Sequence, residues 1–370
     1  MPSSATAQAD LGALIDLTKT SQTILSQFLA TLTPQSSTLT STPARSETQD
    51  TSVDPLGLFK DAATLLKAHT TKLSLLLINK PFTATAITRV LRDITGTVLP
   101  AMMGGVQICE ARAEAHLTSR VVEKEARARV RRVMSAVAEE LVEVKGMAER
   151  EIDEGNGGGK AKDGREGRDT LASTGLVWEA CDAMIELQSM GVVGLVVKKA
   201  EEWRATLLDA VEELKEWGEE ADEDEEDEEE DVGSDDEKDS MDDLFGGSDR
   251  MPKGNEELRM QLEASLKKIK TITMLYQAVA KRRLKTFPAK SAPKETDTLD
   301  QLLETLKAIP EMVDEMASSF YDLNGEDAKK ILSECSAKAS LASVLVKQNW
   351  SGQDDEFTAW SAKFQEAIST

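Results

Sequence analysis

Few residues of the chain are of the kinds that carry out chemistry, and those few are widely scattered. The 370 residues include two histidines, His69 and His116, and three cysteines, Cys109, Cys181 and Cys335. Each lies in a segment with helical periodicity, and no partner stands beside it at the spacing of metal ligands. We therefore interpret the cysteines as small buried side chains and the histidines as surface or interhelical residues, and we predict no metal site.

The sequence also lacks the motifs that position a nucleophile or a phosphate. It contains no G-x-S-x-G turn and no H-E-x-x-H pair. The glycines Gly104–Gly105 and Gly157–Gly159 do not join a strand to a helix, and they lack the lysine and serine or threonine of a phosphate loop. These observations favour a protein that is not an enzyme and that has no cofactor and no small-molecule substrate.

The strongest charge signal is one acidic tract. The formal net charge is −23, and most of it comes from Glu219–Asp249, where nineteen residues are acidic and one is a lysine. Charge repulsion and the shortage of apolar side chains predict that residues 219–251 form a disordered linker. Ser234 and Ser240 each precede an acid by three residues, a pattern favoured by kinases of the casein kinase 2 type, so we predict phosphorylation at both. A solvating spacer and a regulatory segment remain equally good interpretations of the tract.

Two basic clusters stand out against this background. Lys281, Arg282, Arg283 and Lys285 are explained equally well as a nuclear import signal or as a cationic helix C-terminus that suits the helix dipole. The other cluster is interleaved with glutamates and indicates a solvated helix face or a docking surface: Lys124, Arg127, Arg129, Arg131 and Arg132. The net negative charge argues against direct binding of nucleic acid or of an anionic membrane.

The elements that hold these residues are all predicted to be helices. The apolar share comes mostly from unbranched residues and recurs at helical spacing, and aromatic residues make up only 4% of the chain. The predicted helices cover 11–32, 55–78, 84–94, 101–152, 171–190, a stretch from the break at Gly191 and Gly194 to Trp217, 256–286, 298–321 with a kink or break at Pro310, 325–347 and 354–368. We expect an N-terminal bundle (1–218, with loops 33–54 and 155–168), the acidic linker (219–251) and a C-terminal bundle (252–370).

The expected location is the cytoplasm and the nucleus. The first residues do not read as a secretory signal, and the most apolar windows are too short to cross a bilayer. An odd number of cysteines without a disulfide framework suits a reducing compartment.

Two short segments resemble a known family. Asn79–Thr83, and above all Val177–Trp178–Glu179–Ala180–Cys181, are similar to segments of the cyclin-D-binding (cyclin-D-interacting, GCIP) proteins. The similarity covers roughly Leu56–Leu214. It implies helical bundles like those of vinculin, α-catenin and talin, packed up and down. Val177, Trp178, Ala180 and Cys181 are interpreted as packing residues of the family motif, and Trp203 is likewise expected in the core.

The resemblance also implies a role as an adaptor or negative regulator of cell-cycle progression and transcription. The implied partners are cyclin-like or helix-loop-helix proteins, bound through helix surfaces by apolar anchors at i, i+3, i+4 and i+7. Two alternatives stay open. One is a structural adaptor of the vinculin or catenin type in cytoskeletal assemblies, and the other is a binder of basic proteins through the acidic tract.

Overall fold

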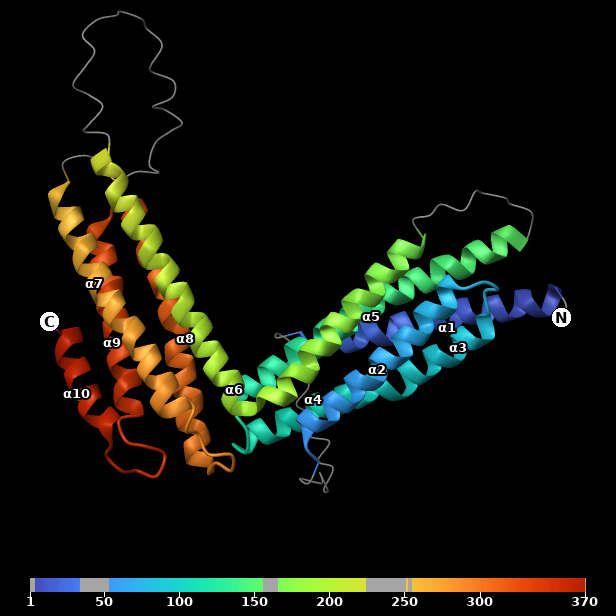
Figure 1. Cartoon of the computed structure of the whole chain (residues 1–370), viewed down its shortest axis with the longest axis horizontal. Coiled ribbons are helices and arrows are strands. Elements are labelled where there is room, and N and C mark those ends of the chain that lie inside the picture. The colour runs from blue at the N-terminus through green and yellow to red at the C-terminus, as the bar shows by residue number, and fades with distance from the viewer. Residues whose placement is uncertain (1–3, 34–52, 156–165, 224–250, 252–254, 370) are drawn as a thin grey trace, which may run out of the picture. The chain divides into compact units, whose positions relative to one another are not determined.

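The described part of the chain is entirely helical apart from turns and short loops. The computed structural model describes residues 4–33, 53–155, 166–223, 251 and 255–369, and no strand occurs among them. The prediction of an all-α fold is therefore confirmed. The chain divides into an N-terminal unit, Met1–Gly191, and a C-terminal unit, Val192–Thr370 (Figure 1).

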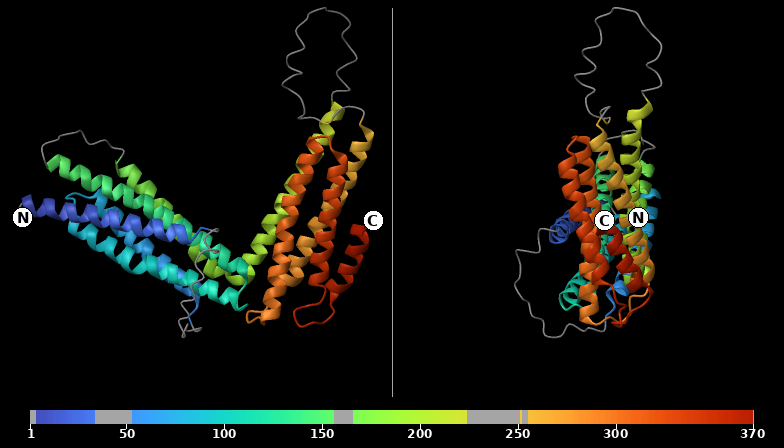
Figure 2. Two further views of the ribbon diagram at one scale, coloured as in Figure 1. Left: turned by 180° about the vertical axis from the view of Figure 1, so that it is seen from behind. Right: turned by 90° about the vertical axis from the view of Figure 1, so that its left-hand side faces the viewer.

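The N-terminal unit is a bundle of long helices. In it α5 packs against α1 and α4, while α3 contacts both α1 and α2, and α2 also contacts α4. The further views in Figure 2 show the same helices running side by side. Its elements are α1 (Ser4–Thr31), α2 (Pro55–Ile78), α3 (Ala84–Asp93), a π-helical turn (Ile94–Val98), α4 (Leu99–Glu114), α5 (Arg120–Gly155) and the first part of α6 (Glu166–Glu223).

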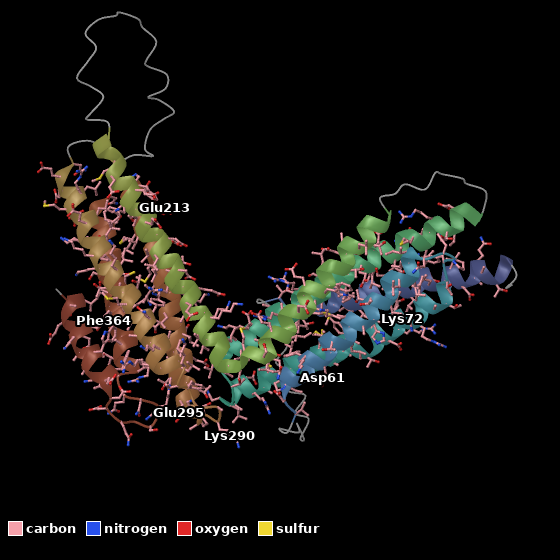
Figure 3. All side chains as sticks on the ribbon, viewed as in Figure 1. Asp61, Lys72, Glu213, Lys290, Glu295 and Phe364 are labelled. Carbon is pink, nitrogen blue, oxygen red and sulfur yellow. The ribbon has the colours of Figure 1, made fainter. Side chains whose placement is uncertain are left out.

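Helix α2 shows how local sequence sets an element. The side chain of Asp54 accepts hydrogen bonds from the backbone N–H groups of Leu56 and Gly57, and Pro55 occupies the first helical position. The predicted bounds of this helix are confirmed. Figure 3 labels Asp61 and Lys72 on it, and both side chains are exposed.

The single helix predicted over 101–152 is wrong, because the chain breaks between α4 and α5. His116 adopts a left-handed conformation with φ of 54°. The N–H of Leu117 then donates to the carbonyl of Arg112, which is the 6→1 bond of a Schellman motif. Ser119 caps the start of α5 with its side-chain oxygen. No glycine or proline marks this break, so helical periodicity alone could not reveal it.

Helix α6 belongs to both units. It contains a kink at Gly191, where φ is 59° and ψ is −165°, a conformation that essentially only glycine adopts. The break predicted at this glycine is confirmed. The predicted domain boundary at residue 218 is not confirmed, because the structure divides the chain after Gly191.

The stretch of α6 after Gly191 packs on the C-terminal unit. Trp217 makes an edge-on aromatic contact with Tyr321, with ring centroids 5.5 Å apart. The Tyr321 hydroxyl donates to Glu213, labelled in Figure 3, over 3.0 Å. The acidic composition beyond residue 218 suggested a domain boundary there, whereas the apolar stripe before it faces helices that come later in the chain.

By length and composition alone, a stretch of α6 between Thr170 and Glu219 is apolar enough to cross a membrane; it is the one such helix among the described residues. The core helix of a soluble protein passes the same test, so this is weak evidence.

The rest of the C-terminal unit consists of four helices and a π-helical turn. Helix α9 packs against α7, α8 and α10. Helix α8 continues through Pro310, so no break occurs there. The elements are α7 (Glu256–Val279), the π-helical turn (Ala280–Leu284), α8 (Pro293–Tyr321), α9 (Gly325–Leu345) and α10 (Glu356–Ser369).

Candidate protein-interaction surface

The motif Val177–Cys181 on α6 has a buried face and an exposed face. Val177, Ala180 and Cys181 are buried, as predicted for packing residues, but Trp178 is 39% exposed. The prediction that Trp178 lies in the core is therefore wrong. At about 100° per residue, Trp178 lies about 100° from Val177 and about 160° from Ala180 around the helix, which places it at the edge of the buried face. Trp203 is half-buried and lies in the C-terminal unit, so it is not a core residue of the N-terminal bundle either.

Trp178 is held by a charged pair that joins α6 to α2. The Lys67 ammonium lies 6.0 Å from the centroid of the indole ring. The same Lys67 Nζ is 2.5 Å from Oδ1 of Asp182, one turn along α6 from the tryptophan. This contact fixes Lys67 beside the ring, while both charged side chains stay partly exposed.

Exposed apolar side chains extend this surface along both helices. Helices α2 and α6 run in opposite directions in the N-terminal unit (Figure 1). The end of α2 therefore lies towards the start of α6. Leu75 and Ile78 are exposed on the former, and Leu171 is exposed on the latter, two turns before Trp178. We call this set the Trp178 surface: Lys67, Leu75, Ile78, Leu171, Trp178 and Asp182.

The thiols do not take part in this surface. All three cysteines are free and buried, which confirms their prediction as small core residues. Burial raises the pKa of the Cys109, Cys181 and Cys335 thiols to about 12, so the nucleophilic thiolate is scarce at neutral pH. Within the described ranges no group of three histidines, cysteines or acids is placed to hold a metal ion.

The second predicted site, the basic cluster of the C-terminal unit, is divided between surface and core. Lys281 and Lys285 are exposed and Arg282 is half-buried, but Arg283 is only 1% exposed. Its guanidinium makes two bonds to Asp355, of 2.7 Å and 2.8 Å. Arg283 is thus unavailable to an import receptor in the folded protein, and the import-signal hypothesis does not hold for this residue.

Arg283 instead ties together the end of the C-terminal unit. Its Nε donates to the carbonyl of Val346 at 2.7 Å, and its Nη2 donates to that of Lys347 at 3.0 Å. The guanidinium also lies 4.5 Å from the ring centroid of Phe357. The hydrogen bond from Arg283 lowers the pKa of Asp355 to about 2. A buried cation with all these partners is a structural residue.

Residues 219–223 continue helix α6, so the prediction that the disordered linker begins at residue 219 is wrong. The rest of the acidic tract lies outside the described residues, and with it lie Ser234 and Ser240. Their predicted phosphorylation stays a prediction. The same holds for the loops predicted at 33–54 and 155–168, of which only the edges are described.

Bundled helices, an exposed tryptophan with an apolar surround, and inert thiols define an all-helical protein with a candidate surface for protein partners. Residues 58–220 match the family model described as Grap2 and cyclin-D-interacting, N-terminal. This match confirms the resemblance carried by Val177–Cys181, and it includes both helices that form the Trp178 surface.

Two fungal relatives extend the similarity beyond this domain. An uncharacterized protein of Schizosaccharomyces pombe is 25% identical over 313 residues, which cover 84% of this chain and 83% of the relative. An uncharacterized protein of Saccharomyces cerevisiae is 24% identical over 207 residues, which cover 54% of this chain and 58% of the relative. The first relative therefore shares similarity with most of the chain.

Proposed function

We propose that this chain is a non-enzymatic protein-interaction adaptor that binds a partner protein through the Trp178 surface. The observation that carries the proposal is the exposure of Trp178 inside the family motif. Tryptophan is among the residues most often found at the energetic centre of interfaces, and exposed apolar side chains lie further along the same two helices. The description of the matching family makes a D-type cyclin the first partner to test.

A substitution at Trp178 separates an interface residue from a packing residue. Trp178→Ala should cost roughly 1–2 kcal/mol of stability, less than the 3–5 kcal/mol typical of a fully buried tryptophan. It should also weaken binding to an immobilised D-type cyclin by about thirtyfold, as expected of a hot spot. Leu176→Ala is the matched control, because Leu176 is exposed on the same helix but is rotated by about 200° from Trp178 around the helix axis. Equal binding by both variants would refute the proposed surface.

Regulation of cell-cycle progression in the nucleus and cytoplasm is the biological role we propose for this interaction. It rests on the description of the matching family. Phosphorylation at Ser234 and Ser240 is the proposed regulation. Fractionation of cells followed by mapping of phosphopeptides tests both statements, and an exclusively extracellular protein would contradict the role.

A further inference from the structure

A groove on the N-terminal unit lies apart from the Trp178 surface. It is formed where the end of α1, the end of α4 and the start of α5 meet, and its volume is about 620 Å³. Leu32, Ala113 and Ala128 contribute its apolar lining. A cavity of this size accommodates several side chains of a bound peptide.

One arginine holds the groove in shape. Arg127 Nε donates to Glu123 over 2.8 Å, and its Nη2 donates to Glu110 of α4. Its Nη1 donates to the carbonyl of Thr31 at the end of α1, over 3.4 Å. Because Arg127 connects three helices, the groove is already formed without a bound partner. The positive charge of Arg127 is compensated by the carboxylates of Glu110 and Glu123.

Two cations in the wall of the groove, Lys124 and Arg131, lack compensation of this kind. Arg120, Lys124, Arg127 and Arg131 recur at i, i+4, i+7 and i+11 of α5, which places them on one helical face. Lys124 and Arg131 are exposed, and within the described chain neither has an ion pair.

We propose that this groove binds an acidic peptide segment of a partner protein that carries a short apolar anchor. The carboxylates of the segment pair with Lys124 and Arg131, and the anchor contacts the apolar lining. A nucleic acid fits less well, because Glu110, Glu114 and Glu123 also line the groove and repel a continuous phosphate backbone. This inference does not depend on the Trp178 surface.

The test uses the full chain and a fluorescein-labelled octapeptide of sequence EDDLFDEE, with fluorescence anisotropy as the readout. The double variant Lys124→Glu/Arg131→Glu should weaken binding at least about fivefold, because two ion pairs are replaced by repulsion. The control Lys72→Glu/Arg132→Glu makes the same change of net charge at exposed positions outside the groove, and it should bind like the unmodified chain. Ala128→Trp, at an exposed helical position, should block the groove without disturbing the core.

Two further ligands test the chemistry of recognition. The amide peptide QNNLFNQQ and the peptide EDDSSDEE, which lacks the apolar pair, should each bind more weakly than EDDLFDEE. The proposal is overturned if both charge-reversal variants bind the peptide equally, or if the amide peptide binds as well as the acidic one. Tighter binding of an eight-nucleotide single-stranded RNA would overturn it in favour of a nucleic-acid site. Binding that is seen only after residues 224–250 are deleted would assign the groove to the chain's own acidic tract.

Discussion

Replacing Glu140 by glutamine tests whether the core of the N-terminal unit holds a protonated carboxyl group at neutral pH. Glu140 lies on α5 and is only 1% exposed, and neither of its carboxyl oxygens has a hydrogen-bond partner. Burial raises the pKa of Glu140 from 4.5 to about 8. The charge of Glu140 also contributes to the raised pKa of the buried Cys181 thiol on α6.

The size of the effect follows from this pKa. Between pH 4.5 and 8 the folded state keeps the proton of Glu140 while the unfolded state has lost it. Stability therefore falls as the pH rises through this range, by at most about 1.4 kcal/mol per pH unit and roughly 5 kcal/mol in all. Glutamine has nearly the same shape and no charge. The gain from Glu140→Gln should be near zero at pH 5 and should reach several kcal/mol at pH 8.

The assay must report on one unit of the chain at a time. Labelling of thiols in urea, read by mass spectrometry of peptides, does so, because Cys109 and Cys181 are buried in the N-terminal unit and Cys335 in the C-terminal unit. Glu139→Gln, at the neighbouring exposed position, is the control. If Glu140→Gln and the unmodified chain lose the same stability between pH 5 and 8, the carboxyl group is solvated and the reasoning fails.

Three further substitutions test packing and charge. A Cβ added at Gly105 would lie 2.5 Å from the buried ring of Phe59, so Gly105→Ala should destabilise the protein by about 1–3 kcal/mol. Gly104 has open space around it, so Gly104→Ala should stabilise the helix by roughly 0.5–1 kcal/mol. Urea unfolding measures both changes. Equal effects at both glycines would contradict the close contact. Asp355→Ala removes the carboxylate that pairs with the buried guanidinium of Arg283, and it should lower the free energy of unfolding by about 3 kcal/mol at pH 7. Because the pKa of Asp355 is lowered from 3.8 to about 2, its stabilisation is present above pH 4 and is lost as the pH falls towards 2. Acid denaturation of the variant should show a smaller loss over that range.

The features that could be predicted from the sequence are those that depend on neighbouring residues. Asp54 and Pro55 define the start of α2, and Gly191 marks the kink of α6, because caps and glycines act locally. The break at His116 could not be predicted in this way. The left-handed residue is a histidine, and the hydrogen bonds that close the turn join backbone groups, so no residue type marks this break in the sequence.

The candidate sites required distances between residues far apart in the chain. Residue type predicts a buried tryptophan at position 178 and an exposed arginine at position 283, but Trp178 is 39% exposed and Arg283 only 1%. Arg283 is buried against Val346 and Asp355, which lie more than sixty residues later in the chain. The buried position of Glu140 does have a signal in the sequence. Glu140 stands three residues after Val137 and four before Val144, and a charged residue within such an apolar stripe indicates a buried carboxyl group.

The kink at Gly191 means that the C-terminal unit is assembled from two separate pieces of chain. The first piece is 192–223, and the second begins at 255, so the acidic tract is an insertion within this unit. The two pieces correspond to the complementary fragments of a split protein, which fold together although each is a separate stretch of chain. A protease cut inside the tract would give two bands on a denaturing gel but one species in gel filtration. A fragment beginning at residue 252 would leave Tyr321 and Leu262 without the helix that covers them. A peptide of residues 192–223 added in trans should restore that cover.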